Sequence, residues 1–109
     1  MDNYGIVIAD KTGTIRHWSR GAEIFFGYPA IDAVGQSLDL IVPTEYREQH
    51  WYGFHKAIES GTANLDGQST EIPVLCHDGS IVAFQSAFNL MRNAQKQVIG
   101  VMVIFGPRV

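Results

Sequence analysis

Short apolar segments separated by turn residues dominate the first third of the chain. The run Tyr4–Asp10 is apolar and rich in β-branched residues, and Thr14–Ser19 alternates apolar with polar positions, so both predict strands. The DKTG sequence between them predicts a tight turn, which makes the two strands a hairpin. The spacing then becomes helical over Ser19–Tyr28, with Ser19 as the expected N-cap and Gly27 as the expected end.

The longest helical pattern runs from Pro43 to Gly61, after one or two short helical turns that Gly35 interrupts. Proline suits the first position of a helix, and Glu45 and Glu48 suit its positive N-terminal end. Glycine at position 61 suits its end. We therefore expect one long helix here, preceded by shorter ones.

Three apolar segments follow, with turn residues at His77–Gly79 and near Asn93–Gln95, and they predict three further strands. In the middle strand the more apolar set at period two is expected to face the helices: Val82, Phe84, Ser86, Phe88 and Leu90. The alternate set is expected to face outward: Ile81, Ala83, Gln85 and Ala87. The outward set is itself fairly apolar, so it could dock a partner or a flanking helix.

The order of these elements predicts an α+β domain. Consecutive hairpins imply a five-stranded antiparallel sheet, with the helices on one face. A small ligand would fit in the space between sheet and helices. With 109 residues the chain is expected to form a single domain over residues 1–109.

Composition and charge exclude several functions. Hydrophobic residues make up 46% of the chain and charged residues 17%, as in folded globular proteins. The net charge is −3 and no basic cluster occurs, so we expect this domain to bind neither nucleic acid nor a membrane surface. A single cysteine, Cys76, excludes an internal disulfide and fits the cytoplasm. No catalytic motif is present, so we do not expect an enzyme.

Three segments of the chain, in this order, resemble the sequences of PAS sensory domains: GIVIADKTGTIRHWSRGAEIFFGY, VGQSLDLIVP and HDGSIVAFQSAFNLMRN. The resemblance runs from about Tyr4 to Phe105. It implies a sensor of bacterial signal transduction, in a two-component system or a transcription regulator, that pairs as a homodimer through PAS–PAS contacts. The chain ends in FGPRV instead of the exit motif of many PAS domains, so the output domain is expected outside this chain.

One stripe of the long helix carries the candidate ligand residues. Helical spacing aligns His50, Gly53, Phe54, Ala57 and Ile58, so His50 is expected to point toward the sheet. Glycine inside a helix costs about 1 kcal/mol relative to alanine. Beside an inward histidine it would let a flat group such as a porphyrin approach the backbone. The alternative is a hydrogen-bonded core histidine, with Gly53 making room for a strand phenylalanine.

The stretch IVPTEYREQH is similar to the long-helix entry in heme PAS domains of rhizobial oxygen-sensing kinases, oxygen-sensing phosphodiesterases and carbon-monoxide regulators. The resemblance places His50 on the proximal heme histidine, so it implies b-type heme and sensing of a diatomic gas or redox state. Thr70 stands where the kinases have an oxygen-binding arginine. Gln68 stands near the place of the methionine ligand of the phosphodiesterases.

Further residues complete the predicted site. Phe54, Ser86 and Phe88 would line the cavity, and Gly100 with Met102 on the last strand would do the same. Candidate contacts to the heme propionates are Lys56, Asn64 and His55. Cys76 is expected to be a buried, inert thiol. Two other functions stay open: a PAS pocket for another small molecule, and a PAS module without ligand that dimerises and transmits a signal.

Overall fold

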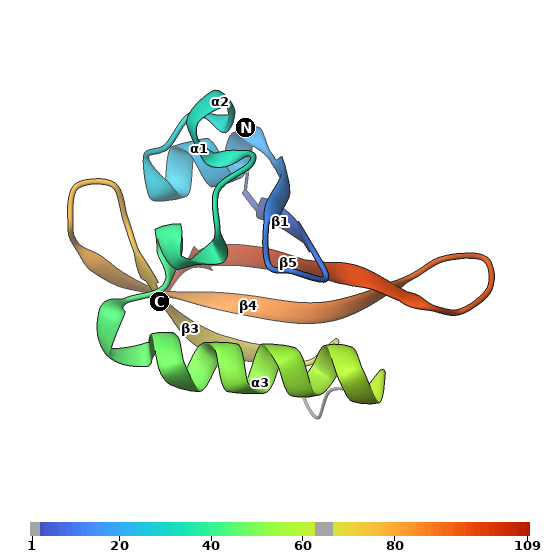
Figure 1. The fold of residues 1–109 in the computed structure, drawn as a ribbon. Helices are drawn as coiled ribbons and strands as arrows, with labels where there is room; N and C mark the ends of the chain where they lie inside the picture. Colours follow the sequence, from blue (N-terminus) through green and yellow to red (C-terminus); the bar gives the residue numbers. More distant parts are fainter. Residues whose placement is uncertain (1–2, 63–66) are drawn as a thin grey trace.

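The computed structural model describes residues 3–62 and 67–109, and its centre is one antiparallel sheet (Figure 1). The strand order is β2-β1-β5-β4-β3, so the first and last strands of the domain are neighbours. The strands are β1 (Gly5–Asp10), β2 (Ile15–Trp18), β3 (Ser69–Leu75), β4 (Ile81–Arg92) and β5 (Val98–Arg108). The α+β prediction with a five-stranded antiparallel sheet is confirmed.

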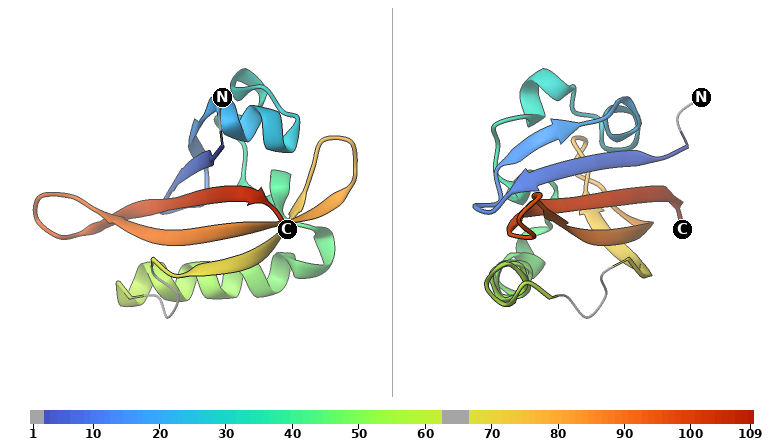
Figure 2. Two further views of the ribbon diagram at one scale, coloured as in Figure 1. Left: turned by 180° about the vertical axis from the view of Figure 1, so that it is seen from behind. Right: turned by 90° about the vertical axis from the view of Figure 1, so that its right-hand side faces the viewer.

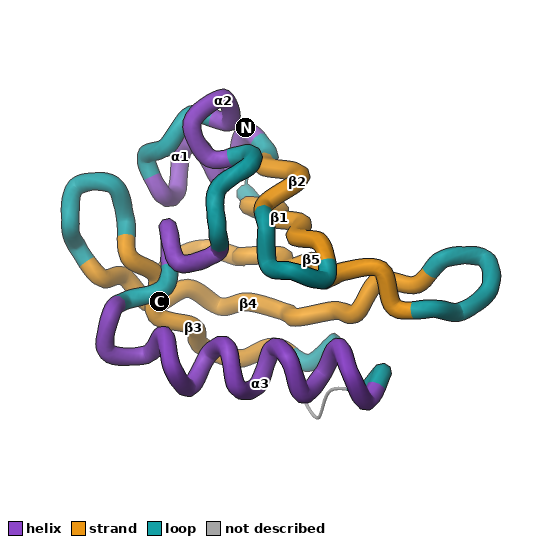
Figure 3. Tube along the Cα trace, in the orientation of Figure 1, coloured by secondary structure: helices purple, strands orange, loops and turns teal. Residues whose placement is uncertain are grey.

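The helices lie at two ends of the sheet (Figures 2 and 3). Helices α1 and α2 lie near β1 and β2, whereas α3 lies toward the other edge of the sheet in the view of Figure 1. Their bounds are α1 (Arg20–Phe26), α2 (Ala30–Ala33) and α3 (Arg47–Ser60), with the 3-10 turns η1 (Leu38–Ile41) and η2 (Thr44–Tyr46) between α2 and α3. All of them contribute to one apolar core against the same face of the sheet, except η2.

The alternation predicted for β4 is present. Phe84, Ser86 and Leu90 are buried, and Val82 and Phe88 pack against the core. On the alternate positions Ile81 and Gln85 are exposed. The more apolar face of β4 therefore meets the helices, because burying aromatic side chains removes the most surface from water.

Local polar contacts fix the start of α1. The Ser19 hydroxyl accepts hydrogen bonds from the backbone N–H of Ala22 at 3.2 Å and of Ile6 at 2.8 Å. The first is the expected N-cap, and the second ties the helix start to β1. Gly27, in the left-handed conformation, ends the helix as predicted.

The long helix begins later than the pattern predicts. Thr44–Tyr46 form the 3-10 turn η2, and the α-helix proper starts at Arg47. The residues after a proline can take either geometry, and tight 3-10 turns are common at helix starts. Gly61 ends the helix as expected, in the left-handed conformation.

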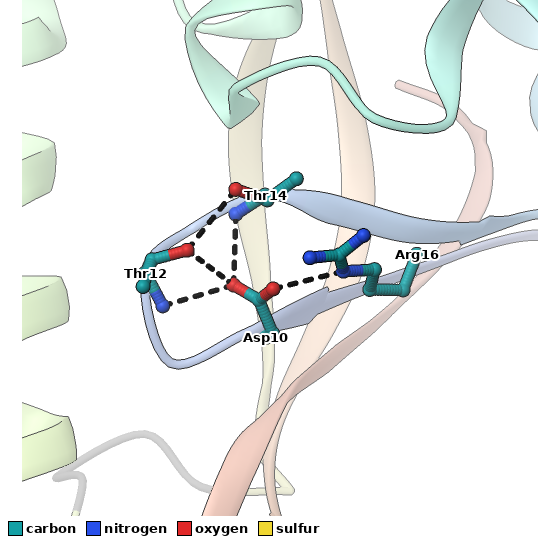
Figure 4. A network of polar contacts seen from close by, with 4 residues as sticks. All are labelled: Asp10, Thr12, Thr14 and Arg16. Atoms are coloured by element: carbon teal, nitrogen blue, oxygen red, sulfur yellow. Dashed lines mark hydrogen bonds and ion pairs between the residues drawn. The ribbon is translucent and has the colours of Figure 1, made fainter.

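A polar network closes the β1–β2 hairpin (Figure 4). The Asp10 carboxylate accepts hydrogen bonds from the Thr12 hydroxyl at 2.6 Å and the Thr12 N–H at 2.9 Å. It also accepts from the Thr14 N–H at 3.2 Å and pairs with the Arg16 guanidinium at 2.8 Å. The bond from the Thr12 hydroxyl is the main cause that lowers the pKa of Asp10 to about 2.

This network predicts an acid-sensitive contribution to stability. The folded-state pKa of Asp10 lies below the usual 3.8, so the contribution is present above pH 3.8 and is lost as the pH falls toward 2. Replacing Asp10 with Asn should lower the free energy of unfolding by about 1–2 kcal/mol at pH 7, allowing for partial solvent screening. Urea unfolding at pH 7, 4 and 3 checks this: the gap between parent and variant should narrow with acid. A gap that stays constant would contradict it.

Candidate ligand site on helix α3

Helix α3 meets the core through a stripe that is shifted from the predicted one. Phe54 and Ala57 are buried, and Trp51 and Ile58 pack against the core. Trp51, Phe54 and Ile58 are spaced i, i+3, i+7, so the buried stripe of the helix runs through Trp51 and not through His50. His50 therefore lies at the edge of the buried face.

Trp51 anchors α3 to the first half of the chain. Its indole N–H donates to the Asp39 carboxylate of η1 at 2.7 Å. The ring lies directly over Gly13, where a Cβ would be 2.2 Å from the ring atom Cη2. Gly13 also has a φ of +83°, so the turn needs glycine for its backbone and for the close approach of the ring. This contact joins α3 to the tip of the β1–β2 hairpin.

The His50 imidazole is half-buried and packs between two rings. Its centroid lies 4.8 Å from that of Trp51 and 6.1 Å from that of Phe54. Its Nδ1 atom is buried and makes no hydrogen bond to any described residue. Burial lowers the pKa of His50, opposed in part by the Asp39 carboxylate, while His55 lowers it further. The ring is thus neutral near pH 7, the form in which imidazole binds a metal ion.

The unpartnered nitrogen is chemically informative, since a buried polar atom without a partner costs about 1–3 kcal/mol. A ligand that coordinates this nitrogen or forms a hydrogen bond with it would recover that free energy. Among the described residues of α3, His50 is therefore the side chain best suited to bind a ligand.

Gly53 does not lie on the buried face of α3, where the predicted approach of a porphyrin to the backbone requires it. It is exposed, and a Cβ built there would meet nothing within 4 Å. The helical phase explains this, because the buried stripe passes through Trp51 and Phe54 and leaves position 53 on its outer flank. The expectation that Gly53 belongs to the inward stripe is corrected.

Gly100 and Met102 are also misplaced by the sequence prediction. Val101 and Phe105 are buried in the core and Val103 packs against it, so the alternate positions of β5 face the other side of the sheet. A Cβ at Gly100 would lie 2.3 Å from the Ala9 carbonyl oxygen, which shows that β1 fills this space. Neither residue lines a cavity between sheet and helices.

Ser86 and Phe88 do lie on the helix-facing side of β4. Ser86 is only 2% exposed, and its hydroxyl donates to the Phe84 carbonyl at 3.1 Å. Its oxygen can still accept a hydrogen bond. Phe88 is half-buried against the core and pairs with Val103 across the sheet. Both remain candidates for a ligand wall.

The predicted polar contacts lie mostly at the surface. Lys56 is exposed and sits 5.8 Å above the Tyr52 ring, on the outward side of α3. Gln68 is exposed just before β3, and His55 stacks on Trp51 at 5.7 Å. Asn64 lies outside the described residues. Cys76 is buried as predicted, and that burial is the main cause of its raised pKa.

Comparison with known proteins identifies the family. The family described as PAS fold matches residues 3–108, so this chain belongs to the PAS family. A PAS domain from Colwellia psychrerythraea superposes with a TM-score of 0.83 at 25% identity, covering 99% of this chain and 87% of that one. The PAS domain of the Cronobacter turicensis quorum-sensing receptor RpfR, in complex with C12:0, has a TM-score of 0.72 at 16% identity, covering 97% and 95%.

Two curated proteins also match. The Escherichia coli oxygen sensor protein DosP is 26% identical over 76 residues, or 70% of this chain and 10% of its own length. An uncharacterized protein of Azorhizobium caulinodans is 24% identical over 99 residues, or 90% of this chain and 14% of its own length. The chain thus spans only a small part of these relatives. Over the residues that the structure describes, no helix is long and apolar enough to cross a membrane.

Proposed function

We propose that this chain is the heme-binding input domain of a bacterial regulatory protein, with His50 as the axial ligand of b-type heme. The observation that carries the proposal is the buried, unpartnered Nδ1 of His50 beside Phe54. A neutral imidazole on an apolar helix face is the chemistry that heme iron requires from its protein ligand.

Similarity to an oxygen sensor supports the proposal. The match to DosP covers 70% of this chain, and the sequence resembles heme PAS domains around His50. When bound, the heme iron would supply the binding of a diatomic gas or a change of redox state. The chain would contribute the imidazole and the apolar wall of Phe54 and Phe88. Lys56 has no part in this site because it points outward.

The outer face of the sheet supports a homodimer. It presents half-buried apolar side chains of three adjacent strands, among them Ile6, Ile8, Ala87, Met102 and Ile104. A second PAS domain would remove this surface from water.

We place the whole protein in the cytoplasm, as a two-component or transcription regulator whose output domain lies outside this chain.

Colour tests the proposed cofactor directly. We expect the protein purified from heme-supplemented cells to be red, with an intense porphyrin absorption band and close to one heme per chain. Carbon monoxide added to the reduced protein should shift that band, because a gas would bind the iron. A colourless protein that fails to take up added hemin would overturn the heme assignment. It would favour a PAS pocket for another small molecule or a module without ligand.

A further inference from the structure

A concave site lies away from His50, between the end of α1, the β3–β4 turn and the end of β5. It is a cavity of about 480 Å³. The His77 N–H donates to the Phe26 carbonyl at 2.8 Å, so the turn is held against the end of α1. In Figure 1, α1 lies above the central strands of the sheet and α3 lies below them.

The wall of this cavity is aromatic. The rings of Phe25 and Phe84 are stacked, with centroids 5.4 Å apart and planes at 19°. Val82 and the Cys76 thiol complete the inner wall, and Ile24 stands at the rim with 60% of its surface exposed. Ligand pockets of roughly 300–1,000 Å³ with mostly apolar walls are typical of small-molecule sites.

The charged residues of the cavity differ in whether they already have a hydrogen-bonding or ion-pair partner. The Asp78 carboxylate accepts from the Ser80 N–H at 2.9 Å and from the Ser80 hydroxyl at 2.6 Å. In contrast, the Arg108 guanidinium pairs with no carboxylate among residues 3–62 and 67–109. It lies near enough to Cys76 to oppose in part the rise in the thiol pKa that burial causes. Among the described residues, a guanidinium without a carboxylate partner therefore borders an aromatic wall.

We propose that this cavity binds a small carboxylic acid with an aromatic or branched apolar body. The body would pack against the Phe25 ring and the Ile24 and Val82 side chains, and the carboxylate would pair with Arg108. A charge-assisted bond of this kind fixes the orientation of the ligand, while the apolar body supplies the buried area. The site is separate from His50, so this proposal does not depend on heme binding.

Calorimetric titration with 3-phenylpropionate and its neutral analogue 3-phenylpropan-1-ol tests the proposal. We expect the acid to bind the 109-residue protein with a Kd on the order of 0.1 mM. Arg108→Gln should weaken the acid about 10-fold and the alcohol less than about 2-fold. Lys11→Gln, which removes an exposed cation at the hairpin tip, is the matched control and should change neither. Ile24→Trp should block both ligands at the rim.

The single cysteine gives a second measurement. The buried Cys76 thiol lines the cavity, so its reaction with Ellman's reagent should be slow. The acid should slow this reaction further in the parent but not in Ile24→Trp. His50→Ala should keep both the affinity and the protection. Three results would each overturn the proposal: no binding at millimolar acid, equal weakening of acid and alcohol by Arg108→Gln, or loss of binding in His50→Ala.

Discussion

Replacing His50 with Ala should reduce the heme content of the purified protein to less than a tenth of the parent value. The imidazole is the only group of α3 with a buried, unpartnered nitrogen among the described residues, so its loss removes the proposed ligand. Absorption at the porphyrin band, relative to protein concentration, measures this. The fold should persist, with the free energy of unfolding changed by no more than about 1 kcal/mol, because the half-buried ring makes no hydrogen bond that the variant would lose.

His55→Ala is the matched control. His55 is exposed on the same helix and also contacts Trp51, so its loss perturbs the helix without removing the proposed ligand. This variant should take up heme like the parent. If His50→Ala kept the parent's heme content and spectrum, the ligand assignment would be wrong even though the PAS fold would stand.

Two glycine-to-alanine changes in helices should have opposite effects on stability. A Cβ at Gly21 of α1 would lie 1.7 Å from the Tyr4 carbonyl oxygen, a backbone atom that cannot move aside. Gly21→Ala should therefore lower the free energy of unfolding by about 3 kcal/mol or more. At Gly53 of α3 a Cβ would meet nothing within 4 Å, so Gly53→Ala should raise it by roughly 0.5–1 kcal/mol through helix propensity.

Urea unfolding of both variants measures these effects. A Gly21→Ala protein as stable as the parent would contradict the close packing of α1 on the start of β1. Gly53→Ala also bears on heme: a more stable variant with unchanged heme uptake would exclude a close approach of porphyrin to position 53. A stable variant that no longer takes up heme would restore Gly53 to the site.

Most of the fold could be predicted because its signals are local. The hairpin turns, the Ser19 cap and the Gly27 and Gly61 helix ends each depend on a few consecutive residues. The inward face of β4 was also predictable, since its two phases differ strongly in aromatic content. The heme ligand stays a prediction, because no observed contact tests it.

The wrong predictions concern which face of an element is buried, and they fall on elements with apolar residues on more than one face. In β5 the run VIGVMVIF is apolar at odd and even positions, so only its pairing with β1 and β4 decides that Met102 faces outward. On α3 the choice between a stripe through His50 and one through Trp51 depends on what packs opposite. The signal for Trp51 was present in its spacing from Phe54 and Ile58.

The strand order has a consequence for how this domain can be synthesised and folded. The central strand β5 is the last to leave the ribosome, yet β1, the first to leave, pairs with β5 on one edge and with β2 on the other. A nascent chain that still lacks β5 cannot complete the sheet. Until β5 is synthesised, the edge of β1 that will pair with it stays unpaired. Pairing between segments this distant in sequence is slow to form, so the waiting hairpin is the part of the nascent chain most exposed to aggregation.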